Sequence, residues 1–223
     1  YDGGHKQDRF LTGTLGNYAE YVSVCPEVEC GMSIPRETLR LAGDIDNPRL
    51  ITSRTQKDYT EQMTAWAHKR VAELEKENLC GFIFKKDSPS SGMTRVKVYN
   101  EKGVAEKKGI GIFARIFMET FPLLPVEEEG RLHDNKLREN FIERIFVNRR
   151  WRKLVSESMT RGDLVDFHTK HKLLILSHSE KHYRLMGKLV AESKTLPLEK
   201  RYDDYMKLLT AALMLKTTVA KHT

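Results

Sequence analysis

The sequence predicts a three-layer α/β domain with a mainly parallel sheet over residues 1–130, followed by an all-α helical bundle over residues 131–223. Two observations predict this division. Short apolar runs of strand length alternate with helical patterns in the first half, whereas only helical patterns occur in the second. The excess of basic residues is confined to the second half. We therefore expect two domains with different roles.

The first half contains four runs with strand character and two with helical periodicity. Strands are expected at residues 21–24, 49–52, 80–84 and 96–99. A helix is expected over residues 59–77, with Asp58 as N-cap and Glu61 three residues later. Its apolar face comprises Met63, Trp66, Ala67, Val71 and Leu74. A second helix, over residues 110–121, carries residues expected in the core: Phe113, Ile116, Phe117 and Phe121.

The segment 123–130 has the composition of a domain edge, because it combines Pro125, an acidic run and Gly130. Charge changes at the same place. Residues 130–223 hold 20 Lys+Arg against 11 Asp+Glu, a net charge of +9, whereas residues 1–129 hold 18 against 20, a net charge of −2.

The second half is expected to be helical throughout. An apolar stripe begins it, formed by Leu137, Phe141, Ile142, Ile145 and Phe146. Further helices are expected over residues 163–176, 180–193 and 198–215.

The basic residues of the second half are candidates for RNA contact, because cations without matching acids favour phosphate backbones. A solvated helix face is the alternative interpretation. The candidates are Arg138, Arg149, Arg150, Arg152, Lys153, Lys170 and Lys172.

Aromatic and histidine side chains of the same half allow two interpretations each. Trp151, Tyr183 and Tyr202 would offer stacking surfaces if exposed, and core packing otherwise. Four histidines lie at helical spacing, where phosphate or RNA contact is favoured over a metal site because no carboxylate or cysteine follows the spacing. They are His168, His171, His178 and His182.

Composition excludes several classes of protein. No apolar run approaches the roughly 20 residues that cross a bilayer. Three cysteines at irregular spacing argue against a secreted disulfide framework and for the cytoplasm. The chain starts at Tyr1 and stops at Thr223, and we expect sequence to be missing at its ends. No obligate protein partner is expected.

Candidate chemistry lies in two loops that are expected to follow strands, Cys25-Pro26-Glu27 and residues 87–93. A loop thiol can be a nucleophile or a metal ligand, and a neighbouring carboxylate can move protons. An inert buried thiol is the alternative. Cys25 and Cys30 do not have a zinc-site spacing, and no pairing with His5 can be inferred.

Several strings of the first half resemble the thiouracil desulfurase (TudS) family: YDGGHK at Tyr1, VCPEVECGM at Val24, PRE at Pro35, KKDSPSSGM at Lys85, RVKVY at Arg95 and GIGIFAR at Gly109. The second half, from EEEGRLHDNKLRENFIERIFVNRRW through DFHTKHKLLILSHSEKHY, resembles the YbgA-type helical domain that is fused to it in tRNA thiouridine desulfidases (RudS).

The resemblance implies a [4Fe-4S] cluster held by three cysteines, with one iron open for the substrate's sulfur. Cys25 is implied as one ligand and Glu27 as the group that transfers protons, while Ser88 and Ser90 would orient the base or the sulfur. The implied reaction is non-redox desulfuration of a thiolated uracil or uridine, above all 4-thiouridine in tRNA, with release of sulfide.

The chain departs from the family pattern at two ligands. The first ligand is expected upstream of Tyr1, and Ser91 stands where the family has its third cysteine. Cys30, or less readily Cys80, would substitute for it. Two other functions therefore stay open: a non-catalytic RNA-binding protein with a degenerate cluster site, and a desulfurase of free thiopyrimidines.

Overall fold

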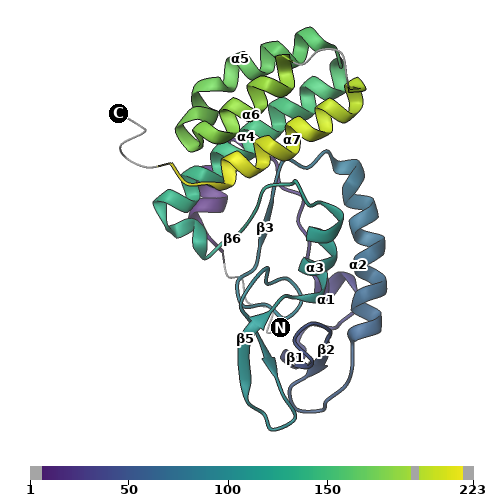
Figure 1. Cartoon of the computed structure of the whole chain (residues 1–223). Coiled ribbons are helices and arrows are strands. Elements are labelled where there is room, and N and C mark those ends of the chain that lie inside the picture. Colours follow the sequence, from purple (N-terminus) through teal and green to yellow (C-terminus); the bar gives the residue numbers. More distant parts are fainter. Residues whose placement is uncertain (1–6, 192–195, 218–223) are drawn as a thin grey trace. The chain divides into compact units, whose positions relative to one another are not determined.

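The computed structural model describes residues 7–191 and 196–217, and it divides into two compact units (Figure 1). The α/β unit comprises Tyr1–Pro122 and Val126–His133. The helical unit comprises Leu123–Pro125 and Asp134–Thr223. The motif at residues 1–6, with His5, and the carboxyl-terminal residues 218–223 lie outside the described residues. No described helix is both long enough and apolar enough to span a membrane.

The α/β unit contains a four-stranded sheet in the order β2-β1-β4-β5 and a two-stranded sheet of β3 and β6. β1 pairs antiparallel with β2 and parallel with β4, and β4 pairs antiparallel with β5. The α/β class is confirmed, but the expected mainly parallel sheet is wrong: the sheet is mixed, because tight hairpins create two antiparallel pairs. The strands are β1 Leu39–Gly43, β2 Pro48–Thr52, β3 Phe82–Phe84, β4 Val96–Tyr99, β5 Ala105–Gly109 and β6 Val126–Glu128.

Residues 21–24, expected as a strand, form no strand in the structure. Tyr21 is exposed and its hydroxyl donates to the Leu11 carbonyl, 3.0 Å away. Val22 is also exposed. Because these apolar side chains do not enter a core, nothing draws the segment into a sheet. The preceding chain forms two short turns, η1 Phe10–Thr14 and η2 Leu15–Asn17.

Two helices pack together in the α/β unit, α2 Thr60–Leu74 and α3 Ile112–Thr120, and the 3₁₀ turn η3 Glu75–Glu77 extends α2. The expected buried positions of α2 are confirmed, except that Trp66 is half-buried. Asp58 is not the N-cap. That position belongs to Tyr59, and the Asp58 carboxylate accepts from the Thr60 amide at 2.8 Å. The expected core positions Phe113, Ile116 and Phe117 of α3 are confirmed as buried, whereas Phe121 is only half-buried. Phe113 and Phe117 contact Phe82 and Phe84.

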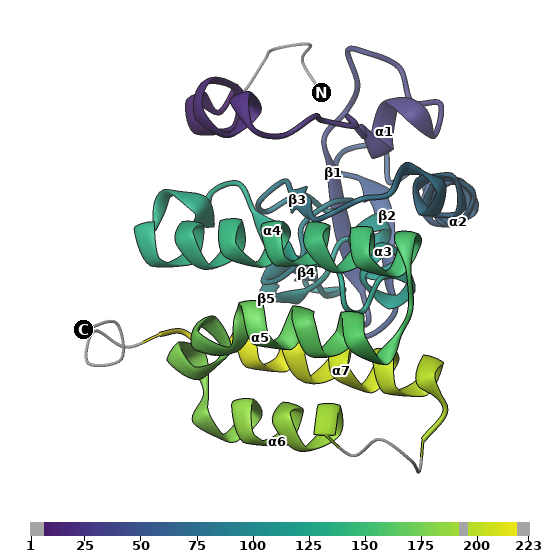
Figure 2. The same ribbon diagram turned by 90° about the horizontal axis from the view of Figure 1, so that it is seen from above.

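In its described residues, the helical unit has four helices, which follow the 3₁₀ turn η4 Arg131–His133 that ends the α/β unit. In Figure 2, α5 and α7 run side by side and α6 packs against both. Their core is formed mainly by Trp151, Phe167, Ile175, Met186 and Tyr205. The helices are α4 Asn135–Glu157, α5 Arg161–His178, α6 Glu180–Ala191 and α7 Leu198–Met214.

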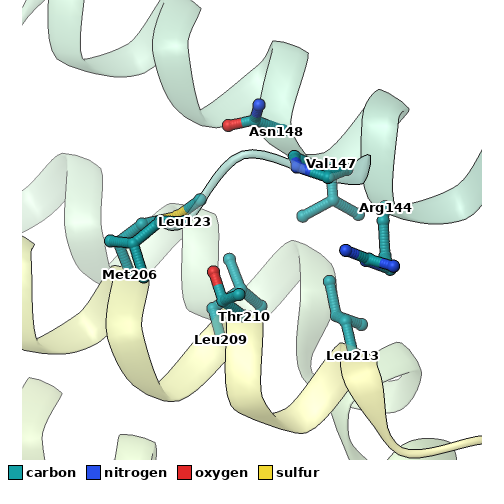
Figure 3. Close-up of a pocket in the computed structure, with 9 residues that line it drawn as sticks. Leu123, Arg144, Val147, Asn148, Met206, Leu209, Thr210 and Leu213 are labelled. Carbon is teal, nitrogen blue, oxygen red and sulfur yellow. The ribbon is translucent and has the colours of Figure 1, made fainter. Parts of the chain in front are cut away.

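The buried face of α4 differs from the expected apolar stripe. Phe141, Val147 and Trp151 are buried together with the polar Arg144 and Asn148. Phe146 of the expected stripe is instead 40% exposed. The segment Leu123–Pro125 lies against α4 and α7, where Figure 3 shows Leu123 above Met206 and Thr210. The cavity beside it has a volume of only about 10 Å³, which is about one water molecule, and is therefore not a substrate site.

The loop between β3 and β4, which we call the serine loop (residues 87–93), is seated on the start of α3. The first amides of a helix lack partners within the helix. Here the Ile112 amide donates to the Pro89 carbonyl at 3.3 Å, and the Ala114 amide donates to the Ser90 carbonyl at 3.1 Å. Gly111 allows this approach, since a Cβ atom there would lie 2.7 Å from the Ser91 nitrogen and closer still to the Ser90 carbonyl.

Gly111→Ala is expected to lower the free energy of unfolding of the α/β unit by about 1–3 kcal/mol, because backbone must move to admit the methyl group. Urea denaturation measures the loss, and amide hydrogen exchange of the serine loop and α3 locates it. Gly13→Ala is the matched control, since its Cβ would meet no atom within 4 Å. Equal stability of the two variants would contradict the close approach.

Candidate functional site

Glu27 and two serines form a hydrogen-bonded cluster in the α/β unit, which we call the carboxylate–serine cluster (Glu27, Ser88 and Ser90). Glu27 lies on the short helix α1 Pro26–Glu29, and the serines lie on the serine loop. The Ser90 hydroxyl donates to Glu27 Oε1, and the Ser88 and Ser90 hydroxyls are 2.9 Å apart. Ser90 is completely buried. The structure thus brings together three side chains that the sequence had placed on separate loops.

Two further groups border the second oxygen of Glu27. The Cys25 Sγ lies 3.9 Å from Glu27 Oε2. The Arg36 Nη2 lies 3.6 Å from the same oxygen, and the Arg36 Nη1 is buried without a hydrogen-bond partner among the described residues. Sequence reasoning missed Arg36, although it lies in the Pro35-Arg36-Glu37 string. A cation beside the carboxylate holds that side chain in position opposite Ser90.

The exposed Cys25 is held through its backbone. Its amide donates to Glu29 Oε1 at 2.8 Å, and Glu29 forms an ion pair with Arg70 of α2 at 3.0 Å. Pro26 at the first position of α1 fixes the direction in which the short helix leaves Cys25. The Cys25 thiol therefore sits at the surface beside Glu27, on a backbone anchored to α2.

The other two cysteines lie in different surroundings. Cys30 is buried, and its thiol donates to the Glu27 carbonyl at 3.3 Å. Burial, with the nearby Glu27 charge, raises the pKa of the Cys30 thiol, so the thiol form is favoured over the ligating thiolate. Cys80 precedes β3, at the opposite end of that strand from the serine loop, and contacts the Asn78 carbonyl.

The described residues do not fit a site in which three thiols hold an iron–sulfur cluster. Ser91, at the expected third position, is buried, and its amide donates to the Ser88 hydroxyl at 3.1 Å. A serine hydroxyl does not replace a thiolate as an iron–sulfur ligand. Within residues 7–191 and 196–217, no group of three or more histidine, cysteine, aspartate and glutamate side chains is placed to hold a metal ion. Cys25 is the single exposed thiol beside the carboxylate–serine cluster.

The acidic run at residues 127–129, interpreted from sequence as part of a domain edge, overlaps the end of β6 and anchors the serine loop. Glu129 accepts from the Lys86 amide at 2.7 Å, and Glu128 accepts from the Met93 amide at 3.2 Å. Burial raises the pKa of Glu128. The two ends of the serine loop are therefore fixed by carboxylates that sequence reasoning did not connect with the site.

The seven basic residues predicted to contact RNA lie on α4 and α5. Arg149, Arg150, Lys170 and Lys172 are exposed. The remaining candidates have internal contacts or lower exposure: Arg138 donates to Asn135, Lys153 lies 3.6 Å from Glu157, and Arg152 is half-buried.

The aromatic residues and histidines of this unit are mostly used in packing. Trp151 stacks on Tyr205 and contacts Tyr202, both of which are buried. His171 and His178 are also buried, so the expectation that they contact RNA is wrong. His171 bonds to the Phe167 carbonyl, and His178 lies 2.8 Å from Glu143. His168, His182 and Tyr183 are half-buried. His168 stacks on Tyr183, and His182 contacts Ser179.

Comparisons with known proteins bear on both units. Residues 1–129 match the model of the family described as 2-thiouracil desulfurase, and residues 172–223 match the family described as "Protein of unknown function (DUF1722)". The Escherichia coli (strain K12) "Uncharacterized protein YbgA" is 32% identical over 81 residues, which cover 36% of this chain and 48% of that protein. This chain thus matches about half the length of that relative.

Among solved structures, the chain is similar to a "[4Fe-4S]-dependent thiouracil desulfidase TudS", with 23% identity, a TM-score of 0.47, and coverage of 60% of this chain and 83% of that one. The desulfurase model matches more than half of the chain and supports thiouracil desulfuration as the chemistry of the α/β unit. The expected resemblance is therefore confirmed: this protein belongs to the 2-thiouracil desulfurase family and carries a YbgA-type region fused to its desulfurase domain.

Proposed function

We propose that this protein hydrolyses the carbon–sulfur bond of a thiolated uridine, with 4-thiouridine in tRNA as its substrate. The observation that carries this proposal is the hydrogen bond between Ser90 and Glu27, with Ser88 behind and the Cys25 thiol exposed beside the carboxylate. These groups supply a proton acceptor and hydroxyl donors at one point, as hydrolysis of a thiocarbonyl requires.

The reaction balances without an oxidant or a reductant. Water adds through oxygen to the thiocarbonyl carbon while Glu27 accepts one of its protons. The electrons of the carbon–sulfur bond leave with sulfur, which takes up both protons of the water and departs as hydrogen sulfide. Ser90, which donates to Glu27 in the resting arrangement, orients the carboxylate and returns the proton toward the sulfur through the Ser88 hydroxyl.

The [4Fe-4S] cluster expected from the family resemblance has one candidate ligand, Cys25, among the described residues, and no step above passes through it. The sequence contains three cysteines, an odd number at irregular spacing. This pattern is typical of a reducing compartment, and we place the reaction in the cytoplasm.

The helical unit supports tRNA as the form of the substrate. Residues 130–223 carry a net charge of +9, and Arg149, Arg150, Lys170 and Lys172 are exposed on two consecutive helices. Such side chains bind phosphate backbones without reading sequence. A thiolated base would have to leave the stacked structure of the tRNA before it could reach Glu27.

Glu27→Gln is expected to reduce the rate of 4-thiouridine conversion by about 10²–10⁴-fold, because the amide cannot accept the proton from water. Mass spectrometry of digested tRNA, with protein purified and assayed without oxygen, measures uridine formed and 4-thiouridine lost. Glu119→Gln, an exposed position on α3, is the control and should keep full activity. Retention of activity by Glu27→Gln would contradict the assigned role.

Arg149→Ala combined with Arg150→Ala is expected to weaken tRNA binding and to reduce the slope of log K against log salt concentration by roughly one per lost phosphate contact. Filter binding over a salt series measures both. Arg184→Ala is the matched control, because this exposed guanidinium already lies 2.6 Å from Glu180. Binding that is unaffected by the double substitution would instead favour a desulfurase of free thiopyrimidines.

Ser91 favours a second function, that of a non-catalytic RNA-binding protein that has lost a cluster ligand. Ser91 is buried beside Ser88 of the carboxylate–serine cluster. Its hydroxyl is not a ligand of the kind that an iron–sulfur centre requires.

Ser91→Cys distinguishes the two functions in anaerobic protein supplied with iron and sulfide. If the native chain is catalytic, it converts 4-thiouridine without the substitution. If desulfuration and bound iron, measured by mass spectrometry and by visible absorbance, both require Ser91→Cys, the native chain is the non-catalytic form. Ser23→Cys, at an exposed position outside the carboxylate–serine cluster, is the control for non-specific iron uptake.

A further inference from the structure

His178 lies at the end of α5, where hydrogen-bond acceptors from two other segments of the helical unit converge on its ring. Figure 2 shows α5 and α7 ending at the same end of this unit, where α4 begins. The side chain of His178 is only 1% exposed, although histidine is ionisable near neutral pH. A ring buried in this way needs a partner for each of its two nitrogens.

Both ring nitrogens of His178 face acceptors. Nε2 lies 2.8 Å from Glu143 Oε2 of α4, and Nδ1 bonds to the carbonyl oxygen of Leu215, the residue that follows α7. Neither a carboxylate nor a carbonyl can donate a hydrogen, so each ring nitrogen must carry one. A ring with a hydrogen on both nitrogens is the imidazolium cation.

Two helix ends add to the negative potential around this ring. The last carbonyls of a helix lack partners within it, and they give that end a partial negative charge. His178 is the last residue of α5, and its ring also reaches the end of α7. Asn140 of α4 donates to a second carbonyl there, that of Leu213, at 2.8 Å. A cation at this point therefore compensates the ends of both helices.

The other charged or titratable groups near this end of the unit are exposed or have contacts of their own. They are Glu139 and Arg144 on α4, His171 and Lys172 on α5, Glu180, Lys181, His182 and Arg184 on α6, and Lys216 after α7. Glu180 and Arg184 pair with each other at 2.6 Å. Residues 208–214, the end of α7, contain no titratable side chain. Glu143 is thus the carboxylate that sets the charge of the ring.

Helices α4 and α5 are held together in two different ways. Near the connection between them, Trp151 packs edge-on against Phe167, with ring centroids 5.1 Å apart. At the other end of the helix pair, Glu143 bonds to His178. The apolar contact does not change with pH, whereas the contact of His178 requires a proton.

We propose that Glu143, His178 and the Leu215 carbonyl form a pH-sensitive latch, in which a buried imidazolium fastens the ends of α5 and α7 to α4. A neutral ring carries one hydrogen, so its loss of the other leaves Glu143 or the Leu215 carbonyl without a donor. The stabilisation is complete below the pKa of about 6.5 that an unfolded histidine has. It is lost as the pH rises through the higher value at which the folded ring gives up its proton. This inference is independent of the proposed function.

Nitrogen NMR of the whole chain with ¹⁵N-labelled histidine tests the charge, because imidazolium and neutral rings have different nitrogen shifts. The His178 signal is the one that His178→Gln lacks or, if that variant does not fold, the one that Glu143→Gln displaces. At about pH 7.5 we expect both nitrogens of His178 to carry hydrogen. A neutral ring in the native chain at this pH overturns the proposal.

Glu143→Gln should leave the His178 ring neutral at about pH 7.5, because an amide can donate to Nε2 and supplies no negative charge. The Glu143 side chain is 31% exposed, so the variant is expected to fold. Glu139→Gln, one turn earlier and exposed, is the matched control and should leave the ring charged. An imidazolium that persists in Glu143→Gln overturns the part assigned to Glu143.

Hydrogen exchange measured by mass spectrometry tests whether the latch opens. Between about pH 6 and pH 9, the protection of the amides of residues 213–217, corrected for intrinsic exchange rates, should fall roughly tenfold in the native chain and in Glu139→Gln. This is the size expected for one charge-assisted hydrogen bond. In Glu143→Gln the protection should be equally low at both pH values. Unchanged protection of the native chain overturns the latch, even if the ring is charged.

Discussion

The hydrogen bond between Ser90 and Glu27 joins two segments that are 63 residues apart in the sequence, and the geometry of the site depends on it. Neither segment belongs to a regular strand, so neither is positioned by a sheet ladder. Each is instead tied to a helix: the Cys25–Glu29 segment to α2 through Glu29 and Arg70, and the serine loop to α3 through its carbonyls. Since α2 and α3 pack against each other, the two helices set the distance between carboxylate and hydroxyl.

This arrangement places the polar groups of the site before any substrate binds. The serine loop is fixed at its ends by Glu128 and Glu129 and at its middle by the first amides of α3. Its internal bonds, from the Gly92 amide to the Ser88 carbonyl and from the Ser91 amide to the Ser88 hydroxyl, close it into a tight turn. Side chains that are held in this way lose little freedom when a substrate arrives, which is the physical basis of preorganised catalysis.

Apolar periodicity predicted the elements whose stability comes from burial. β2, β4, α2, α3 and the helices of the second half were found from their apolar spacing. β5 was missed because Ala105-Glu106-Lys107-Lys108 is polar and exposed, and only its pairing with β4 makes it a strand. β6 was missed because its carboxylates resemble a solvated linker until the amides that they accept from are known. The strand predicted at residues 21–24 is wrong for the opposite reason. These residues have the composition of a strand but pair with no strand of the described chain.

Part of the site could be anticipated. Residue type and loop position indicated Cys25 and Glu27, and the family resemblance implied roles for Ser88 and Ser90. Arg36 could not be anticipated, because an arginine after a proline is indistinguishable from a surface cation until its distance to Glu27 is measured. The neighbouring cations Arg40 and Lys97 were equally invisible, since they are far apart in sequence and meet only through strand register. Long-range register is information that local patterns do not contain.

The division of the chain into units has a consequence for any attempt to dissect the protein. The polypeptide passes from one unit to the other three times, after Pro122, after Pro125 and after His133. No single cut can therefore separate the units. A fragment that begins at Asp134 lacks Leu123–Pro125, which cover apolar side chains of α4 and α7, and a fragment that ends at Pro122 lacks the strand whose carboxylates fasten the serine loop. Each half, made alone, would be missing a piece of its own core or site that is encoded on the far side of the cut.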